Sequence, residues 1–95
     1  MILWESRAEQ ELQEIYDYIY LSSPQNADSV VDELIQIAEK IINMPYKHPK
    51  EPYFSNEKIR FVAKWKYKII YEIGDIDIII LSVFNTSQTS LKIGR

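Results

Sequence analysis

The sequence predicts an α+β domain with the element order β-α-α-β-β-β, in which a two-helix hairpin packs on one face of an antiparallel-rich sheet. Up to about residue 43, apolar residues recur at spacings of three and four, which is the period of amphipathic helices. After residue 58 they alternate, as in strands. The chain has 95 residues, of which 46% are hydrophobic, so it is long enough for one globular domain, residues 1–95, and too short for two.

A short strand and a first helix open the chain. Ile2, Leu3 and Trp4 are apolar and β-prone, which favours a short strand over residues 2–5. Ser6 and Glu9 have the spacing of a capping box, in which each side chain accepts a hydrogen bond from the other residue's backbone N–H. We therefore expect a helix over about residues 7–21. Its apolar stripe comprises Ala8, Leu12, Ile15, Tyr16, Ile19 and Tyr20.

A second helix is expected over about residues 24–43. Ser23 can cap it, and Pro24 suits its first position because an N–H there would have no helical partner. The helix should end before Met44, since Pro45 follows. The short link makes the two helices an antiparallel hairpin. The second apolar stripe is wide and comprises Ala27, Val30, Val31, Leu34, Ile35, Ala38, Ile41 and Ile42.

The rest of the chain is expected to form an irregular loop followed by strands. Three prolines interrupt the loop, over about residues 45–56. Gly74 and Asp75 are a turn signal of the hairpin kind. The run 76–84 is apolar on nearly every position, as a central strand would be, and residues 85–95 are polar loop with a short terminal element. The expected strands are residues 59–62, 66–73 and 76–84.

Alternation assigns faces to these strands. Every second residue from Tyr67 to Ile73 is apolar, and this row should face the helices. The same alternation then leaves the cations Arg60, Lys66 and Lys68 together on the uncovered face. The row that should face the helices is Tyr67, Ile69, Tyr71 and Ile73.

Charge is divided unevenly along a chain whose formal net charge is −3. Residues 1–39 carry nine acids against one base, whereas residues 40–95 carry ten bases against five acids. The bases are densest between Lys58 and Lys68, where they could meet phosphates or an acidic partner. The alternative is an ordinary solvated strand face, which a pI near 5.1 favours over nucleic-acid binding.

Absent residue types exclude several functions. The chain has no cysteine, and His48 is its one histidine. Thiol catalysis, disulfide scaffolds and metal sites built on cysteine or several histidines are therefore excluded, and we expect no metal or cofactor. No apolar run is long enough to cross a bilayer and no signal peptide is visible, so we expect a cytoplasmic protein without a membrane partner.

Several strings occur in the order typical of one family. Trp4 is followed by Ala8 and Leu12 at intervals of four, and Pro45 lies just after the second helix. The later matches are the strings Ile59-Arg60-Phe61-Val62, Tyr67-Lys68-Ile69-Ile70-Tyr71 and Ile80-Leu81-Ser82-Val83-Phe84-Asn85-Thr86. In these features the sequence resembles the RelE/ParE family of toxins from bacterial type II toxin–antitoxin modules, over about residues 2–93.

The resemblance implies candidate site residues, and departures from the family's pattern qualify them. Arg60 and Lys68 are the candidate catalytic residues, with an electrostatic role on the open sheet face. Lys68 stands where RNA-cleaving members usually carry arginine. The stretch 85–90 has no acid or base, and Ser87 stands where a subset of the family has arginine. The candidate binding residues are Lys66, Asn85, Ser87 and Gln88.

Cleaving RNA through its 2′-hydroxyl needs a general base, cations for the charge that grows on the phosphate, and an acid for the leaving oxygen. Arg60 and Lys68 could supply the cations. The only candidates for the general base are a lysine and Glu57, so whether the chain is an enzyme is left open. The ParE branch of the family acts on DNA gyrase instead and lacks the nuclease residues, as this sequence does.

The resemblance therefore implies the toxin of a type II module, which a cognate antitoxin neutralises and which inhibits growth through gyrase or an undetermined target. The alternatives are a ribosome-dependent messenger-RNA endonuclease and an inactive family member that acts only as a binding module. The expected partners are the antitoxin and either gyrase or the ribosome with its messenger RNA. Whether the chain forms a homodimer is left open.

Overall fold

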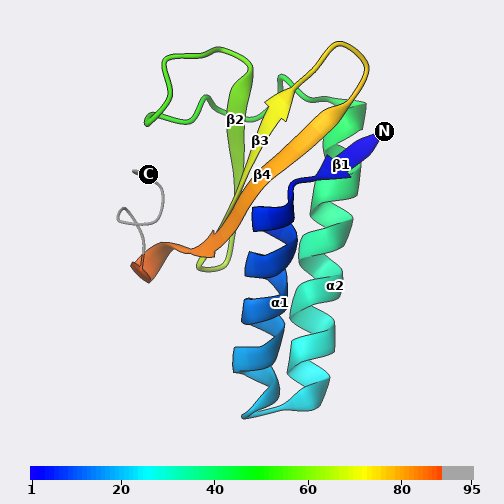
Figure 1. Ribbon diagram of the computed structural model, residues 1–95, viewed down its shortest axis with the longest axis vertical. Coiled ribbons are helices and arrows are strands. Elements are labelled where there is room, and N and C mark those ends of the chain that lie inside the picture. Colours follow the sequence, from blue (N-terminus) through cyan, green and yellow to red (C-terminus); the bar gives the residue numbers. More distant parts are fainter. Residues whose placement is uncertain (89–95) are drawn as a thin grey trace.

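The computed structural model describes residues 1–88, the last of them in its backbone only (Figure 1). The elements are β1 (Ile2–Trp4), α1 (Ser6–Tyr20), α2 (Pro24–Lys40), η1 (Ile41–Asn43), β2 (Ile59–Lys64), β3 (Tyr67–Ile73), β4 (Ile78–Asn85) and η2 (Thr86–Gln88), where η marks a short 3₁₀ turn. The predicted order of strands and helices is confirmed. The rest of the predicted terminal segment, residues 89–95, lies outside the described residues.

The strands form one mixed sheet in the order β1-β4-β3-β2. β1 runs parallel to β4, while β3 pairs antiparallel with both β4 and β2. α1 and α2 lie side by side along one face of this sheet (Figure 1). The predicted α+β class, with a helix hairpin on one face of an antiparallel-rich sheet, is confirmed.

The two helix starts differ in how well the sequence predicts them. At α2 the Ser23 hydroxyl accepts the N–H of Asn26 at 3.2 Å, and Pro24 holds the first position, as predicted. The capping box at α1 is wrong. Glu5 is the N-cap, without a side-chain hydrogen bond, and its carbonyl accepts the Glu9 N–H at 3.0 Å. The Glu9 N–H, which was expected to bind the Ser6 hydroxyl, thus binds a backbone carbonyl instead, because the helix begins one residue before the predicted start.

One hydrophobic core fills the space between the helices and the sheet. Leu34 of α2 and Ile69 of β3 are fully buried in it. Fully burying a side chain of this size stabilises a fold by about 1.5–3 kcal/mol. The row predicted to face the helices is confirmed, since all of it belongs to this core. The core comprises Ala8, Leu34, Ala38, Ile41, Tyr67, Ile69, Tyr71, Ile73, Ile78, Ile80 and Val83.

The opposite face of the sheet carries a second, smaller core beside a long loop. Its buried members are Ile59, Ile70 and Phe84. The loop between η1 and β2 runs along the outer edge of β2. There the Glu51 N–H donates to the carbonyl of Ile59 at 3.0 Å, and the Phe61 N–H donates to that of Pro49 at 3.1 Å. The loop therefore covers an edge that would otherwise present unpaired backbone groups.

Candidate functional site

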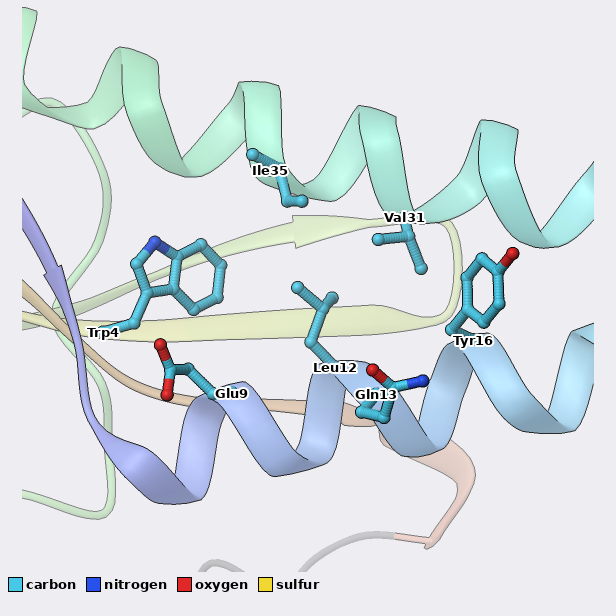
Figure 2. A pocket seen from close by; sticks show the side chains of 7 residues that line it. All are labelled: Trp4, Glu9, Leu12, Gln13, Tyr16, Val31 and Ile35. Atoms are coloured by element: carbon cyan, nitrogen blue, oxygen red, sulfur yellow. The ribbon is translucent and has the colours of Figure 1, made fainter.

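α1 and α2 enclose an apolar groove of about 460 Å³ (Figure 2). Leu12 and Tyr16 stand one turn apart on α1. Val31 and Ile35 stand one turn apart on α2, so two rows of side chains face each other across the groove. Trp4 comes from the end of β1 and lies at one end of the groove (Figure 2). The remaining lining residues are Glu9 and Gln13.

The groove suits an apolar partner surface. Leu12, Val31 and Ile35 are half-buried, so part of each side chain still meets solvent. Glu9 carries the only formal charge among the lining residues. The Tyr16 hydroxyl donates to Oδ1 of Asp28 at 3.0 Å, and this bond raises the pKa of Tyr16, which stays neutral at pH 7. An apolar slot between two helices is a surface that an amphipathic helix can fill with its apolar face.

This groove cannot be recognised from the spacing of apolar residues, because its aliphatic residues fit a buried core equally well. The signal that could have found it is the width of the second stripe. That helix carries more apolar positions than its sheet-facing side can bury, and Val31 and Ile35 are among those left half-buried.

Arg60 does not lie on the face opposite the helices, so this part of the prediction is wrong. In the register of β2 and β3 it is opposite Tyr71, which belongs to the core under the helices. Opposite residues of an antiparallel pair project to the same face. The prediction failed because Ile59 and Phe61 pack into the second core on the far face, beside the loop, rather than under the helices.

The guanidinium of Arg60 holds the loop that follows η1. Its Nη1 donates to the carbonyl oxygens of His48 at 2.8 Å and Tyr46 at 3.3 Å. Its Nε donates to the carbonyl of Glu57 at 2.9 Å, and its Cζ lies 4.9 Å from the centre of the Tyr46 ring. One side chain thus ties both ends of the loop to β2. This use of the guanidinium leaves no bidentate face ready for a phosphate.

Lys68 lies on the predicted face, but that face is not open at this point. Its Nζ is 2.6 Å from Oε1 of Glu51 and 4.2 Å from the centre of the Phe61 ring. Glu51 is fully buried, and among the described residues this ammonium is the one group that pairs with that oxygen. The other carboxylate oxygen accepts the N–H of Tyr53 at 3.2 Å. Lys68 therefore neutralises a buried acid from the loop.

The candidate binding residues Lys66, Asn85 and Ser87 do lie together. They line a cavity of about 410 Å³ between α1 and the ends of β3 and β4, so the prediction that Lys66 lies on the face away from the helices is wrong. Oδ1 of Asn85 accepts the Ser87 N–H at 2.9 Å and its hydroxyl at 2.7 Å. The Lys66 carbonyl accepts the Thr86 N–H at 2.7 Å and its hydroxyl at 3.0 Å. The side chain of Gln88 lies outside the described residues, and the binding role of the whole group stays a prediction.

One wall of this cavity holds a buried carboxylate that the sequence analysis misses. Glu11 of α1 accepts the Ser82 hydroxyl at 2.8 Å and the Val83 N–H at 3.0 Å. The β3–β4 ladder is irregular here, since Leu81 has no opposite residue in β3. The carboxylate thus satisfies polar groups at a bulge and joins α1 to the end of β4. One more acid on an acidic helix gives no sequence signal for such a contact.

Arg60 and Lys68 do not converge on one point, because they lie on opposite faces and each is bound to protein groups. His48 lies edge-on to the Tyr71 ring, with 6.3 Å between ring centres. Burial, and then the charge of Lys47, lowers the pKa of His48. Within residues 1–88, no cluster of three or more acidic, histidine or cysteine side chains could hold a metal ion, and no helix has the length and apolar character to span a membrane.

The chain matches the model of a known family. The model of the ParE toxin of the type II toxin–antitoxin system parDE matches residues 2–89. A search of curated proteins finds no match.

Solved structures with a similar fold include two toxin–antitoxin systems. The chromosomal ParDE toxin–antitoxin system from P. aeruginosa matches with a TM-score of 0.72 and 20% identity, covering 88% of this chain and 92% of that chain. The toxin–antitoxin complex RelBE2 from Mycobacterium tuberculosis matches with a TM-score of 0.57 and 15% identity, covering 90% of this chain and 95% of that chain. At these identities the likeness concerns the fold.

Proposed function

This chain belongs to the ParE toxin family of type II toxin–antitoxin systems, and from that membership we propose that it arrests bacterial growth by inhibiting DNA gyrase. A cognate antitoxin neutralises it by placing a helix in the groove between α1 and α2. The proposed target is inferred from the ParE branch of the family. The proposed partner is inferred from the groove between the two helices.

One observation supports gyrase over RNA cleavage as the activity. Arg60 and Lys68 are the cations that would hold the charge of a cleaving phosphate, and both are already engaged. Arg60 binds backbone carbonyls on the helix side of the sheet, while Lys68 binds Glu51 on the far side. Electrostatic catalysis requires such groups to be aimed at the same developing charge. A toxin that acts by binding an enzyme has no such requirement.

The groove supports an antitoxin helix as the partner. Its two walls present aliphatic and aromatic side chains at helical spacing, and Trp4 lies at one end (Figure 2). Residues 1–39, which include α1 and most of α2, carry nine acids against one base. A helix with an apolar face and basic flanks therefore matches the surface in both shape and charge.

Induction of the chain in a bacterial host tests the proposed activity. Plasmid supercoiling and protein synthesis are followed in parallel, with and without the antitoxin encoded beside the chain's own gene. We expect growth to stop, supercoiling to fall before translation does, and the antitoxin to restore both. Translation that collapses first, with supercoiling intact, contradicts gyrase inhibition and favours a messenger-RNA endonuclease. Growth that continues unchanged favours an inactive binding module.

A charge placed in the groove tests the antitoxin site. Val31→Glu puts a carboxylate on the apolar wall, and Ile76→Glu makes the same change at an 82% exposed position between β3 and β4. Truncating or charging a central anchor of an interface costs about 2 kcal/mol or more, which is roughly a 30-fold loss of affinity. We expect this loss in calorimetry for Val31→Glu only. Equal antitoxin affinity for both variants places the antitoxin elsewhere.

A further inference from the structure

A tryptophan occupies the tip of the hairpin between β2 and β3 in an unfavourable backbone conformation. Lys64 and Tyr67 are paired across the strands, so the turn consists of Trp65 and Lys66 alone. Trp65 has φ of 54°, and it is the one non-glycine residue within the described chain whose φ is positive. This region is ordinarily left to glycine, asparagine or aspartate, because a larger side chain crowds the backbone there.

Packing does not compensate for this conformation. The Trp65 side chain is 60% exposed and belongs to neither hydrophobic core. The ring contacts the ammonium of Lys64, whose Nζ lies 4.9 Å from the ring centre. A residue that is both strained and exposed contributes little to folding, and such residues concentrate at binding and catalytic sites.

The tip is held in place and lies beside a second exposed aromatic side chain. Thr86 donates its N–H and its hydroxyl to the carbonyl of Lys66, which fixes the turn against the end of β4. Lys66 also lines the 410 Å³ cavity, together with Tyr18 of α1, a residue that is 75% exposed. We define Tyr18, Trp65 and Lys66 as the hairpin-tip surface. It shares no residue with the groove between α1 and α2.

We propose that the hairpin-tip surface is where the chain binds its target enzyme, with Trp65 inserted as the anchor into an apolar pocket that has a carboxylate at its rim. This inference rests on the proposed function, since it assumes a protein target. Tryptophan and tyrosine dominate the energetics of protein interfaces, because each buries a large rigid surface at little cost in side-chain entropy. Lys66 follows the indole in the chain, so a carboxylate on the partner can pair with its ammonium.

The surroundings of the tip favour a protein partner over nucleic acid. Glu33 lies 3.8 Å from the ammonium of Lys64, and Glu14 lines the same cavity as Lys66. Because Lys64 already lies next to Glu33, the tip lacks the row of unopposed cations that a phosphate backbone needs, and the chain as a whole has a net charge of −3. A protein pocket can instead accept one protruding ring without a long run of phosphates.

Substitution of Trp65 by asparagine tests the proposal without endangering the fold. Asparagine tolerates the left-handed region, so Trp65→Asn should melt at the same temperature as the wild type or higher. Ile76→Asn is the matched control, because Ile76 is an 82% exposed apolar residue in the other hairpin connection. The readout is supercoiling of relaxed plasmid by purified gyrase. We expect the half-inhibitory concentration to rise about 30-fold or more for Trp65→Asn and to stay unchanged for the control.

The outcomes separate this proposal from the choice of gyrase. If Trp65→Asn inhibits gyrase as well as the wild type does, the anchor is refuted and gyrase stands. If the wild type arrests growth but leaves gyrase active, gyrase is refuted. In that case, loss of growth arrest in Trp65→Asn supports Trp65 as the anchor. Growth arrest that persists in Trp65→Asn refutes it. If the wild type does neither, both proposals fail. If the wild type binds single-stranded oligothymidine and Trp65→Asn does not, the partner of this surface is a nucleic acid and not a protein.

Discussion

Replacing Lys68 by methionine should destabilise the fold strongly, because the Glu51 carboxylate then stays buried without its partner. The charged atoms are 2.6 Å apart, and Glu51 is fully buried. At an effective dielectric constant of about 20, their gross attraction is about 6 kcal/mol. Removing one partner of a buried pair costs about 3–5 kcal/mol, out of a total stability of about 5–14 kcal/mol for a chain of this length.

Urea unfolding at pH 7 measures this loss. With an m value of about 1.5 kcal/mol/M, the unfolding midpoint of Lys68→Met should fall by about 2–3 M. Lys66→Met is the matched control, since Lys66 is exposed in the same hairpin, and its midpoint should move by less than about 0.3 M. The double variant Glu51→Leu/Lys68→Met removes both charges and should recover most of the loss, because apolar residues replace the pair.

A Lys68→Met midpoint within about 0.5 M of the wild type would show that Lys68 does not neutralise a buried carboxylate. It would mean that Glu51 reaches water in solution and that the loop does not close over this face. Lys68 would then be a free cation on an open sheet surface, and its role in binding a phosphate would regain support.

Three further changes have expected outcomes. Leu34→Ala should cost about 2–5 kcal/mol in urea unfolding as a core truncation, and a loss below 1 kcal/mol would contradict its burial between helix and sheet. Glu11→Ala leaves the Ser82 hydroxyl and the Val83 N–H unpaired and should cost about 1–3 kcal/mol, with hydrogen exchange at Val83 faster than in the wild type. Burial raises the pKa of Tyr71 to about 12 from 10.0. Between pH 10 and 12 the folded state therefore keeps this proton while the unfolded state releases it, so the free energy of unfolding should fall by about 2–3 kcal/mol over this range. A Tyr71→Phe variant that shows the same fall would refute this cause.

The elements and the main core follow from local patterns. The spacing of apolar residues in the two helices and the alternation from Tyr67 to Ile73 report directly which side of each element is buried. The Ser23 cap can be predicted because a serine followed by a proline fits the N-cap and the first position of a helix. The Ser6 cap failed because the preceding residue, Glu5, could serve as N-cap through its backbone alone.

The site depended on contacts that sequence patterns do not carry. The face of Arg60 is set by the strand register and by a loop that covers Ile59 and Phe61, and neither is local. Glu51 lies within the proline-rich loop, where no apolar periodicity indicates that it is buried. Trp65 was equally hidden, since a turn with positive φ is normally signalled by glycine or asparagine and this one contains neither.

A two-step titration of supercoiling by purified gyrase tests whether the chain inhibits this enzyme and whether the antitoxin reverses the inhibition. The chain is added until its effect saturates, and the antitoxin encoded beside its gene is then added in increasing amounts. We expect supercoiling to stop in the first step and to recover in the second, because the antitoxin binds the toxin and removes it from gyrase. Gyrase that stays fully active at a large excess of the folded chain would contradict it.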